Sequence, residues 1–219
     1  AIGESADNII AESTTQSEDN LPPASDQMIK RISDADDSRV QLFRPKSLRN
    51  HKEYHQQLSQ LRQQGLEPAL HGGRRAMVRM LEAISMGAKV KPIAFLINDE
   101  LSNVLVEAGL DTSKTPLYIA ENQELLNEIR GQKLNSGDSI LSLISFPIAS
   151  ELQELIANPP LLILEDVRNA ENVGSILRTA FCLGIKSVVA SSTAWASLCD
   201  TRAARCSLGT MYYHQFYKA

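Results

Sequence analysis

The segment from Leu161 to Ser191 holds the polar residues whose types and spacing could do chemistry. Asn169, Asn172 and Arg178 follow a short apolar run within it. An amide side chain both donates and accepts hydrogen bonds, and a guanidinium can hold a phosphate through two parallel hydrogen bonds. These three residues therefore mark a candidate ligand site.

The elements that must position these residues follow from the apolar pattern. Residues 161–164 are uninterruptedly apolar, which predicts a short strand buried on both faces of a parallel sheet. A polar loop over 169–174 then leads into a helix over 175–183, and Gly184 is the expected end of that helix. Residues 186–191 supply a second apolar strand. This order predicts a βαβ unit whose first loop faces the ligand side of the sheet.

A regular alternation of helices and strands precedes the βαβ unit. Helices are predicted over residues 74–86, 101–108, 121–129 and 149–157, and strands over residues 92–97, 117–119 and 139–146. We therefore predict an α/β protein with a small α/β domain over 67–147. A linker helix and hinge follow over 148–160, and a parallel-sheet domain occupies 161–219.

The charges are unevenly distributed, although the formal net charge is only −4. Residues 1–44 are acidic and contain too little apolar surface to offset the entropy of ordering, so a disordered acidic tail is predicted. Residues 45–66 are predicted to form a polar, basic linker helix, with direct nucleic-acid contact as the alternative. Cations outnumber carboxylates over 44–79, which is the footprint expected of a surface that binds a phosphate backbone.

Missing motifs exclude several classes of protein. No run approaches the roughly 18 apolar residues that cross a bilayer, so no membrane partner is expected. The motifs of dinucleotide enzymes, P-loop ATPases, serine hydrolases and zinc proteases do not occur. Cys182, Cys199 and Cys206 lack Cys-x-x-Cys spacing, which indicates reduced thiols in an intracellular compartment, cytoplasmic or organellar. No metal site is predicted, because Cys199, Cys206 and His214 do not have the usual ligand spacing.

Three segments carry a resemblance to a known family. The Asn-Val-Gly step at 172–174, Arg178 six residues after the asparagine, a following Thr-Ala pair and the closing Gly184 resemble the first motif of the SpoU (TrmH-type) RNA ribose methyltransferases, in the SPOUT superfamily. Upstream, Leu-His-Gly-Gly-Arg-Arg-Ala-Met-Val-Arg-Met-Leu-Glu-Ala at 70–83 is similar to the start of the L30e-like RNA-binding domain that often precedes the SpoU domain. Residues 201–210 resemble the second conserved region of the family in part.

The resemblance implies a methyltransferase that transfers a methyl group from S-adenosylmethionine to a ribose 2′-hydroxyl of structured RNA, either rRNA or tRNA. The implied fold is an L30e-like domain followed by the first part of a SPOUT-type (α/β knot) domain, and the complete protein is expected to be a homodimer. Arg178 would stabilise negative charge on the ribose oxygen, and Asn172 would fix the loop and the arginine. Arg74 and Arg75 would bind RNA. The alternatives are a helix cap or turn residue for Asn172 and a surface arginine for Arg178.

The sequence departs from the family pattern near its end, because the Gly-x-Glu and Ser-x-Asn steps of the family do not occur after Gly209. We therefore expect residues 161–219 to be an incomplete methyltransferase domain, poorly stabilised beyond the βαβ unit and with uncovered apolar strand edges. One alternative function is a non-catalytic RNA-binding or ribosome-assembly protein that retains a partial methyltransferase domain. Another is an unrelated nucleotide-binding α/β protein.

Overall fold

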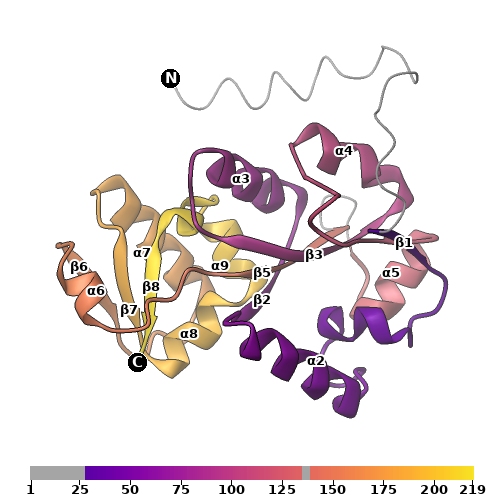
Figure 1. The fold of residues 1–219 in the computed structure, drawn as a ribbon, viewed down its shortest axis with the longest axis horizontal. Coiled ribbons are helices and arrows are strands. Elements are labelled where there is room, and N and C mark those ends of the chain that lie inside the picture. The colour runs from indigo at the N-terminus through magenta and orange to yellow at the C-terminus, as the bar shows by residue number, and fades with distance from the viewer. Residues whose placement is uncertain (1–27, 135–138) are drawn as a thin grey trace.

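The structure, a computed structural model, describes residues 28–134 and 139–219. Two β-sheets lie side by side, with helices packed around them (Figure 1). The strands are β1 (Ile29–Ile32), β2 (Pro68–Gly72), β3 (Lys91–Asn98), β4 (Leu117–Ala120), β5 (Ile140–Ser145), β6 (Leu161–Leu164), β7 (Ser187–Ala190) and β8 (Gln215–Lys218). The α-helices are α2 (His51–Gln63), α3 (Arg74–Ser85), α4 (Ser102–Glu107), α5 (Gln123–Arg130), α6 (Gln153–Ile156), α7 (Ala170–Cys182), α8 (Ser192–Leu198) and α9 (Thr201–Cys206). The 3₁₀ helices are η1 (Ser38–Phe43), η2 (Asp99–Leu101) and η4 (Thr210–Tyr213).

The larger sheet has five strands in the order β1-β4-β3-β5-β2. Strands β1, β4 and β3 run parallel, whereas β5 is antiparallel to both β3 and β2. The strands predicted over 92–97, 117–119 and 139–146 are confirmed as β3, β4 and β5. The register between β3 and β5 shifts between Pro92 and Ala94, where the proline has no N–H group to donate to the ladder.

The two edge strands of this sheet are not predicted by the sequence. Strand β2 contains Pro, Ala, Leu, His and Gly, which have weak strand propensity. It is held by antiparallel pairing with β5, in which Leu70 lies opposite Leu143, and by burial of His71. Tertiary contact therefore overrides local propensity at β2.

The prediction of a disordered acidic tail over residues 1–44 is wrong for residues 28–44. Strand β1 pairs with β4, and Asp37 caps η1 by accepting a hydrogen bond from the backbone N–H of Arg39. Ile32, Val40 and Phe43 are fully buried in a cluster with α5, so a few well-placed apolar side chains offset the ordering entropy of this segment. The remainder of the prediction, residues 1–27, lies outside the described residues.

The polar helix predicted within 45–66 is present as α2. Asn50 caps it by accepting hydrogen bonds from the backbone N–H groups of Lys52 and Glu53, and no residue of the helix is buried. Its function as a linker stays a prediction, as do the domain boundaries.

The smaller sheet is parallel, with the order β6-β7-β8. The predicted βαβ unit is confirmed as β6, α7 and β7. The prediction that residues 161–164 are buried on both faces is wrong, because β6 is an edge strand of this sheet and Ile163 is 65% exposed. Only Leu164 of this strand is buried.

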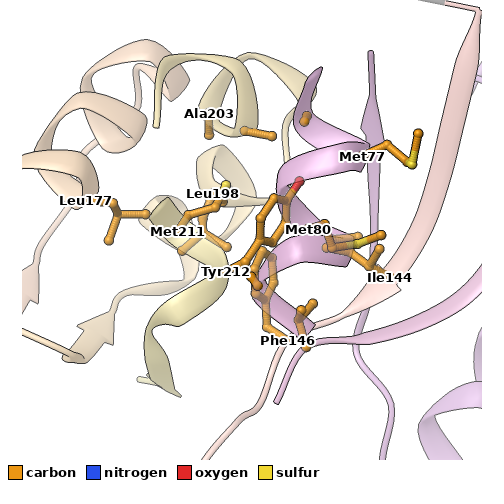
Figure 2. Packing of buried hydrophobic residues seen from close by; sticks show 14 of the residues in the cluster. Met77, Met80, Ile144, Phe146, Leu177, Leu198, Ala203, Met211 and Tyr212 are labelled. Carbon is orange, nitrogen blue, oxygen red and sulfur yellow. The ribbon is translucent and has the colours of Figure 1, made fainter. Parts of the chain in front are cut away.

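Residues 192–218 are well packed, so the expectation that the chain is poorly stabilised beyond the βαβ unit is wrong. Trp195, Met211, Tyr212 and Phe216 are buried in a core that also contains residues from α3, β3 and β5. Figure 2 shows Met77 and Met80 on one side of this cluster and Leu177, Leu198 and Ala203 on the other.

One residue links the two halves of this core. The ring centroid of Phe146 lies 6.2 Å from that of Trp195, 6.2 Å from that of Tyr212 and 5.1 Å from that of Phe216. A single apolar core therefore runs between the two sheets. None of the described helices combines the length and the apolar character needed to span a membrane.

Candidate functional site

The loop that follows β6 lies at the carboxyl ends of the parallel strands. Two serines that follow β7 in the chain hold this loop in place by hydrogen bonds. The backbone N–H of Asp166 donates to Ser191 Oγ at 3.1 Å, and Ser197 Oγ donates to the carbonyl of Arg168 at 2.8 Å. Ser191 also caps α8 by accepting from the N–H of Ala194. The loop is thus fixed by two serines at the start of and within α8, and an exposed ion pair joins Arg168 to Asp166 within the loop.

The helix after this loop begins earlier than predicted. Asn169 caps α7 by accepting from the backbone N–H of Asn172 at 2.9 Å, so residues 170–174 are helical and not a loop. The sequence contained a signal for this start, because an asparagine cap with Glu171 in the first turn is a favourable helix N-terminus. Asn172 therefore lies in the first turn of α7, where its side chain is exposed.

The glycine of the Asn-Val-Gly step has a packing function. Gly174 faces α9, and a Cβ atom at this position would lie 2.4 Å from the carbonyl oxygen of Ala203 and 2.9 Å from Cys206 Cβ. Val173 is fully buried beside it. Of the three residues in this step, Gly174 is therefore required by the contact between α7 and α9, and Val173 belongs to the apolar core.

Arg178 lies in the second half of α7 and is exposed. Its guanidinium makes no hydrogen bond or ion pair with the residues that the structure describes. Six residues of α-helix separate it from Asn172, which places the two side chains about 120° apart around the helix and about 9 Å apart along it. The structure does not bring these two predicted site residues together on one face.

Arg74 and Arg75 occupy the first turn of α3, after Gly73 with φ of +104°. Arg74 is half-buried and Arg75 is exposed. Cations at a helix N-terminus are repelled by the helix dipole, so this end of α3 is a region of positive potential. These residues belong to the part of the molecule built on the five-stranded sheet, whereas Arg178 belongs to the part built on the three-stranded sheet.

Two adjoining cavities, of about 380 and 250 Å³, lie where these two parts of the molecule meet. Leu70, Arg130 and Cys199 line both of them. Neither cavity is lined by any residue from 144 to 198, so neither adjoins the loop after β6. Sequence reasoning missed these cavities because they are assembled from distant segments, although part of their lining lies in the basic stretch 44–79.

Three titratable groups whose pKa values are shifted by burial, those of His71, Cys199 and Tyr212, lie at the same junction. Burial lowers the pKa of His71 to about 4, and a 3.1 Å hydrogen bond joins its Nδ1 to the hydroxyl of Tyr212, whose pKa burial raises. Burial also raises the pKa of the Cys199 thiol to about 12, which makes it a poor nucleophile. Within residues 28–134 and 139–219, no group of three or more His, Cys, Asp or Glu side chains is placed to hold a metal ion.

Comparisons with known proteins identify the fold. No protein-family model matches the sequence, and no curated protein matches it. Among solved structures, the SpoU methyltransferase AviRb from Streptomyces viridochromogenes, in complex with the cofactor AdoMet, aligns with a TM-score of 0.54 and 19% identity over 82% of this chain and 61% of its own. An rRNA methyltransferase from Sinorhizobium meliloti aligns with a TM-score of 0.56 and 14% identity over 88% of this chain and 66% of its own.

A third structure agrees with these two. A putative RNA methyltransferase of the TrmH family from Porphyromonas gingivalis aligns with a TM-score of 0.55 and 19% identity over 86% of this chain and 63% of its own. The fold of the chain is thus similar, over most of its length, to the folds of these SpoU, rRNA and TrmH-family methyltransferases. The chain spans between 61% and 66% of the length of these three chains.

Proposed function

We propose that the protein acts in the methylation of structured RNA, rRNA or tRNA, as a methyltransferase that uses S-adenosylmethionine and modifies a ribose 2′-hydroxyl. The observation that carries this proposal is the shared fold with SpoU/TrmH-family enzymes, one of which holds AdoMet. In this proposal the five-stranded sheet forms an L30e-like RNA-binding domain and residues 161–219 form the first part of a SPOUT-type (α/β knot) domain. The complete protein would be a homodimer.

Arg178 is the residue proposed for catalysis. S-adenosylmethionine supplies a sulfonium methyl group, and its transfer is an in-line displacement that depends on holding the ribose oxygen in place. The exposed guanidinium of Arg178, without a carboxylate partner in the described part of the chain, is available to hold a phosphate beside that oxygen. It would also stabilise the negative charge that develops as the hydroxyl loses its proton.

Asn172 has a narrower proposed role than the family resemblance implies. Its side chain makes no hydrogen bond among the described residues, and it points away from Arg178 around α7. Asn172 therefore contacts substrate or a second subunit in this proposal, and it does not orient Arg178 within one chain. Arg74 and Arg75 are proposed to contact the RNA backbone from the first turn of α3.

Neither of the two cavities is lined by the loop after β6 or by α7, so neither of them lies beside Arg178 as a pocket for the methyl donor. The same observation favours a second candidate function, a non-catalytic RNA-binding or ribosome-assembly protein. In that case the arginine-lined cavities would be the functional site.

An assay with radiolabelled S-adenosylmethionine and total cellular RNA tests the enzymatic proposal. The wild-type protein should incorporate label into nucleotides that resist alkaline hydrolysis, because 2′-O-methylation removes the attacking hydroxyl. Arg178→Ala should lower the transfer rate by about 100-fold or more while cofactor binding, measured by calorimetry, is unchanged. Lys186→Ala, which removes an exposed cation just before β7, is the control for loss of a positive charge and should keep the wild-type rate.

The outcomes separate the candidates. A normal rate for Arg178→Ala would show that the role assigned to this arginine is wrong. Absence of both label transfer and cofactor binding in the wild-type protein would contradict the enzymatic proposal and support the non-catalytic RNA-binding protein.

A further inference from the structure

The smaller of the two cavities is lined by three arginines from separate parts of the chain. Arg44 and Arg49 precede α2, and Arg130 ends α5. Tyr54 of α2, strand β2 and the end of α8 complete the walls, and these elements lie close together around β2 in Figure 1. The remaining lining residues are Leu42, Pro45, Pro68, Ala69, Leu70, Leu143 and Cys199. We name this site, defined by Arg44, Arg49 and Arg130, the arginine pocket.

The three guanidiniums of the arginine pocket are only partly neutralised. Arg44 is 9% exposed, donates from Nη1 to the carbonyl of Ala35 at 2.8 Å and forms an ion pair with Asp36. Arg130 donates from Nη1 to the carbonyl of Phe43 and has no carboxylate partner among the described residues. The Cζ atom of Arg49 lies 3.8 Å from the ring centroid of Tyr54, which is a cation–π contact rather than an ion pair.

Each of these arginines also carries an unused hydrogen-bond donor. The Nε–H groups of Arg44, Arg49 and Arg130 are buried and have no hydrogen-bond partner within the described part of the chain. Among the described residues, no carboxylate lines the arginine pocket. Burying cations and donors in this way is costly unless an oxyanion accepts their hydrogen bonds, and burial accordingly lowers the pKa of Arg130.

The larger cavity extends this positive surface. It shares Arg130 with the arginine pocket and adds Arg202 and Arg205, and Asp200 is the carboxylate among its described lining residues. Arg202 is paired with Asp200, whose Oδ2 lies 3.0 Å from Arg202 Nη2, and Arg205 also interacts with another group. The row of arginine side chains therefore continues beyond the arginine pocket.

We propose that the arginine pocket holds a backbone phosphate of a single-stranded stretch of RNA, whose next phosphates follow the adjoining cavity. Guanidiniums bind phosphate oxygens through paired hydrogen bonds, and a row of cations matches a chain of repeating phosphates better than it matches a single small anion. The choice of RNA as the ligand rests on the proposed function in RNA methylation. The rest of the inference does not depend on that function. The inference adds a binding site at the junction of the two sheets, away from both Arg178 and the first turn of α3.

Fluorescence anisotropy with a labelled single-stranded RNA, measured on the full chain over a range of salt concentrations, tests this proposal. Arg49→Gln is the decisive variant, because Arg49 donates no hydrogen bond to a described residue, so its replacement should leave the fold intact, which circular dichroism checks. The substitution should weaken binding about tenfold and reduce the slope of log K against log salt by about 0.7. Arg130→Gln should act in the same direction, with circular dichroism confirming that it is folded.

The matched control is Arg31→Gln. Arg31 is exposed, is paired with Asp99 and lies on β1, at the opposite edge of the five-stranded sheet from β2. Its loss removes the same charge and should leave the affinity for RNA within about twofold of wild type. A second titration with inorganic pyrophosphate distinguishes a polynucleotide from a small phosphate-bearing ligand.

Several results would overturn the inference. Equal affinities for the wild-type, Arg49→Gln and Arg31→Gln proteins would show that the arginine pocket does not contact RNA, whether or not the protein transfers methyl groups. Binding of pyrophosphate that depends on Arg49, without any binding of RNA, would assign the pocket to a small ligand instead. Loss of RNA binding in Arg49→Gln together with absent methyl transfer in the wild-type protein would support the pocket and contradict only the enzymatic proposal.

Discussion

His71 lies at the junction between the two sheets, and its titration depends on the packing there. His71 is buried on β2 and is hydrogen-bonded to Tyr212 of η4. Its ring centroid lies 5.6 Å from that of Phe146. Three segments that are distant in sequence therefore meet at one imidazole. The negative charge of Asp200 acts on this imidazole and opposes the lowering of its pKa by burial.

Burial of His71 predicts a pH dependence of stability. Its pKa is about 4 in the folded protein and 6.5 in the unfolded chain, so the unfolded chain binds one more proton between these values. The free energy of unfolding should therefore be fully retained above pH 6.5 and should fall as the pH is lowered toward 4. His71 alone should contribute about 2 kcal/mol to the loss between pH 7 and pH 5, measured by urea denaturation with Trp195 fluorescence.

The variant His71→Gln isolates this contribution, because it keeps a hydrogen-bonding partner for Tyr212 but does not titrate. It should lose about 2 kcal/mol less than the wild type between pH 7 and pH 5. His214, whose pKa burial also lowers, contributes equally to both proteins and cancels in the comparison. The same pH dependence in both proteins would show that His71 is not the titrating group.

At the residue scale, the sequence predicted which residues carry suitable chemistry better than it predicted the role of each one. Arg178 has a side chain that is accessible to a ligand. The cap predicted as the alternative role of Asn172 belongs to Asn169, three residues earlier. The arginine pocket could not be predicted, because nothing in the local sequence of Arg130 indicates that α5 ends beside the segment before α2.

At the scale of elements, the contact between α7 and α9 determines how the βαβ unit is joined to the rest of the chain. Gly174 allows the backbone of α9 to approach α7 directly. The motif that resembles the SpoU family is thus partly a packing motif. Long apolar runs such as β3, β5 and β7 were predictable, because burial alone explains them.

The close approach at Gly174 predicts a large effect of a single methyl group. Gly174→Ala would place its Cβ 2.4 Å from the Ala203 carbonyl oxygen, so α7 and α9 must separate. We expect a loss of about 1–3 kcal/mol in the free energy of unfolding, even though alanine favours a helix more than glycine does. Ser175→Ala, at the next and exposed position of α7, is the control and should change stability by less than about 0.5 kcal/mol.

Urea denaturation of the two variants and the wild type provides the measurement. A Gly174→Ala protein as stable as Ser175→Ala would show that the helices separate without cost.

The elements that escaped prediction share one property. Strands β1, β2 and β8 and the helices after β7 are short, and their apolar residues are spaced to meet partners far away in sequence. Their stability comes from the core around Phe146 and Tyr212 rather than from propensity. Sequence patterns predicted the strand and helix order within each half, but not the contacts that join the halves.

At the scale of the whole molecule, the continuous core predicts cooperative unfolding. Trp195 reports on the part built on the three-stranded sheet, whereas far-ultraviolet circular dichroism reports on all helices and strands. Since Phe146 contacts Trp195, Tyr212 and Phe216, both signals should change at the same urea concentration. Phe146→Ala should lower the free energy of unfolding by about 3–5 kcal/mol and shift both signals together.

A matched substitution outside the junction is Leu126→Ala, in the cluster beneath α5, which should also move both signals together. Loss of the Trp195 signal at a lower urea concentration than the circular dichroism signal would contradict a single cooperative unit. It would instead support the two domains predicted from the sequence, with a boundary near residues 148–160.

The pairing of β8 has a consequence for the order of events during protein synthesis. Phe216 bridges Ile148 and pairs with Val188, and its ring fills the space beside Phe146. A ribosome releases residue 146 about seventy residues before it releases Phe216, at rates of roughly 5–20 residues per second. For several seconds the nascent chain must therefore carry Phe146 and His71 without the residues that cover them, and this part of the core closes only after Phe216 has left the ribosome.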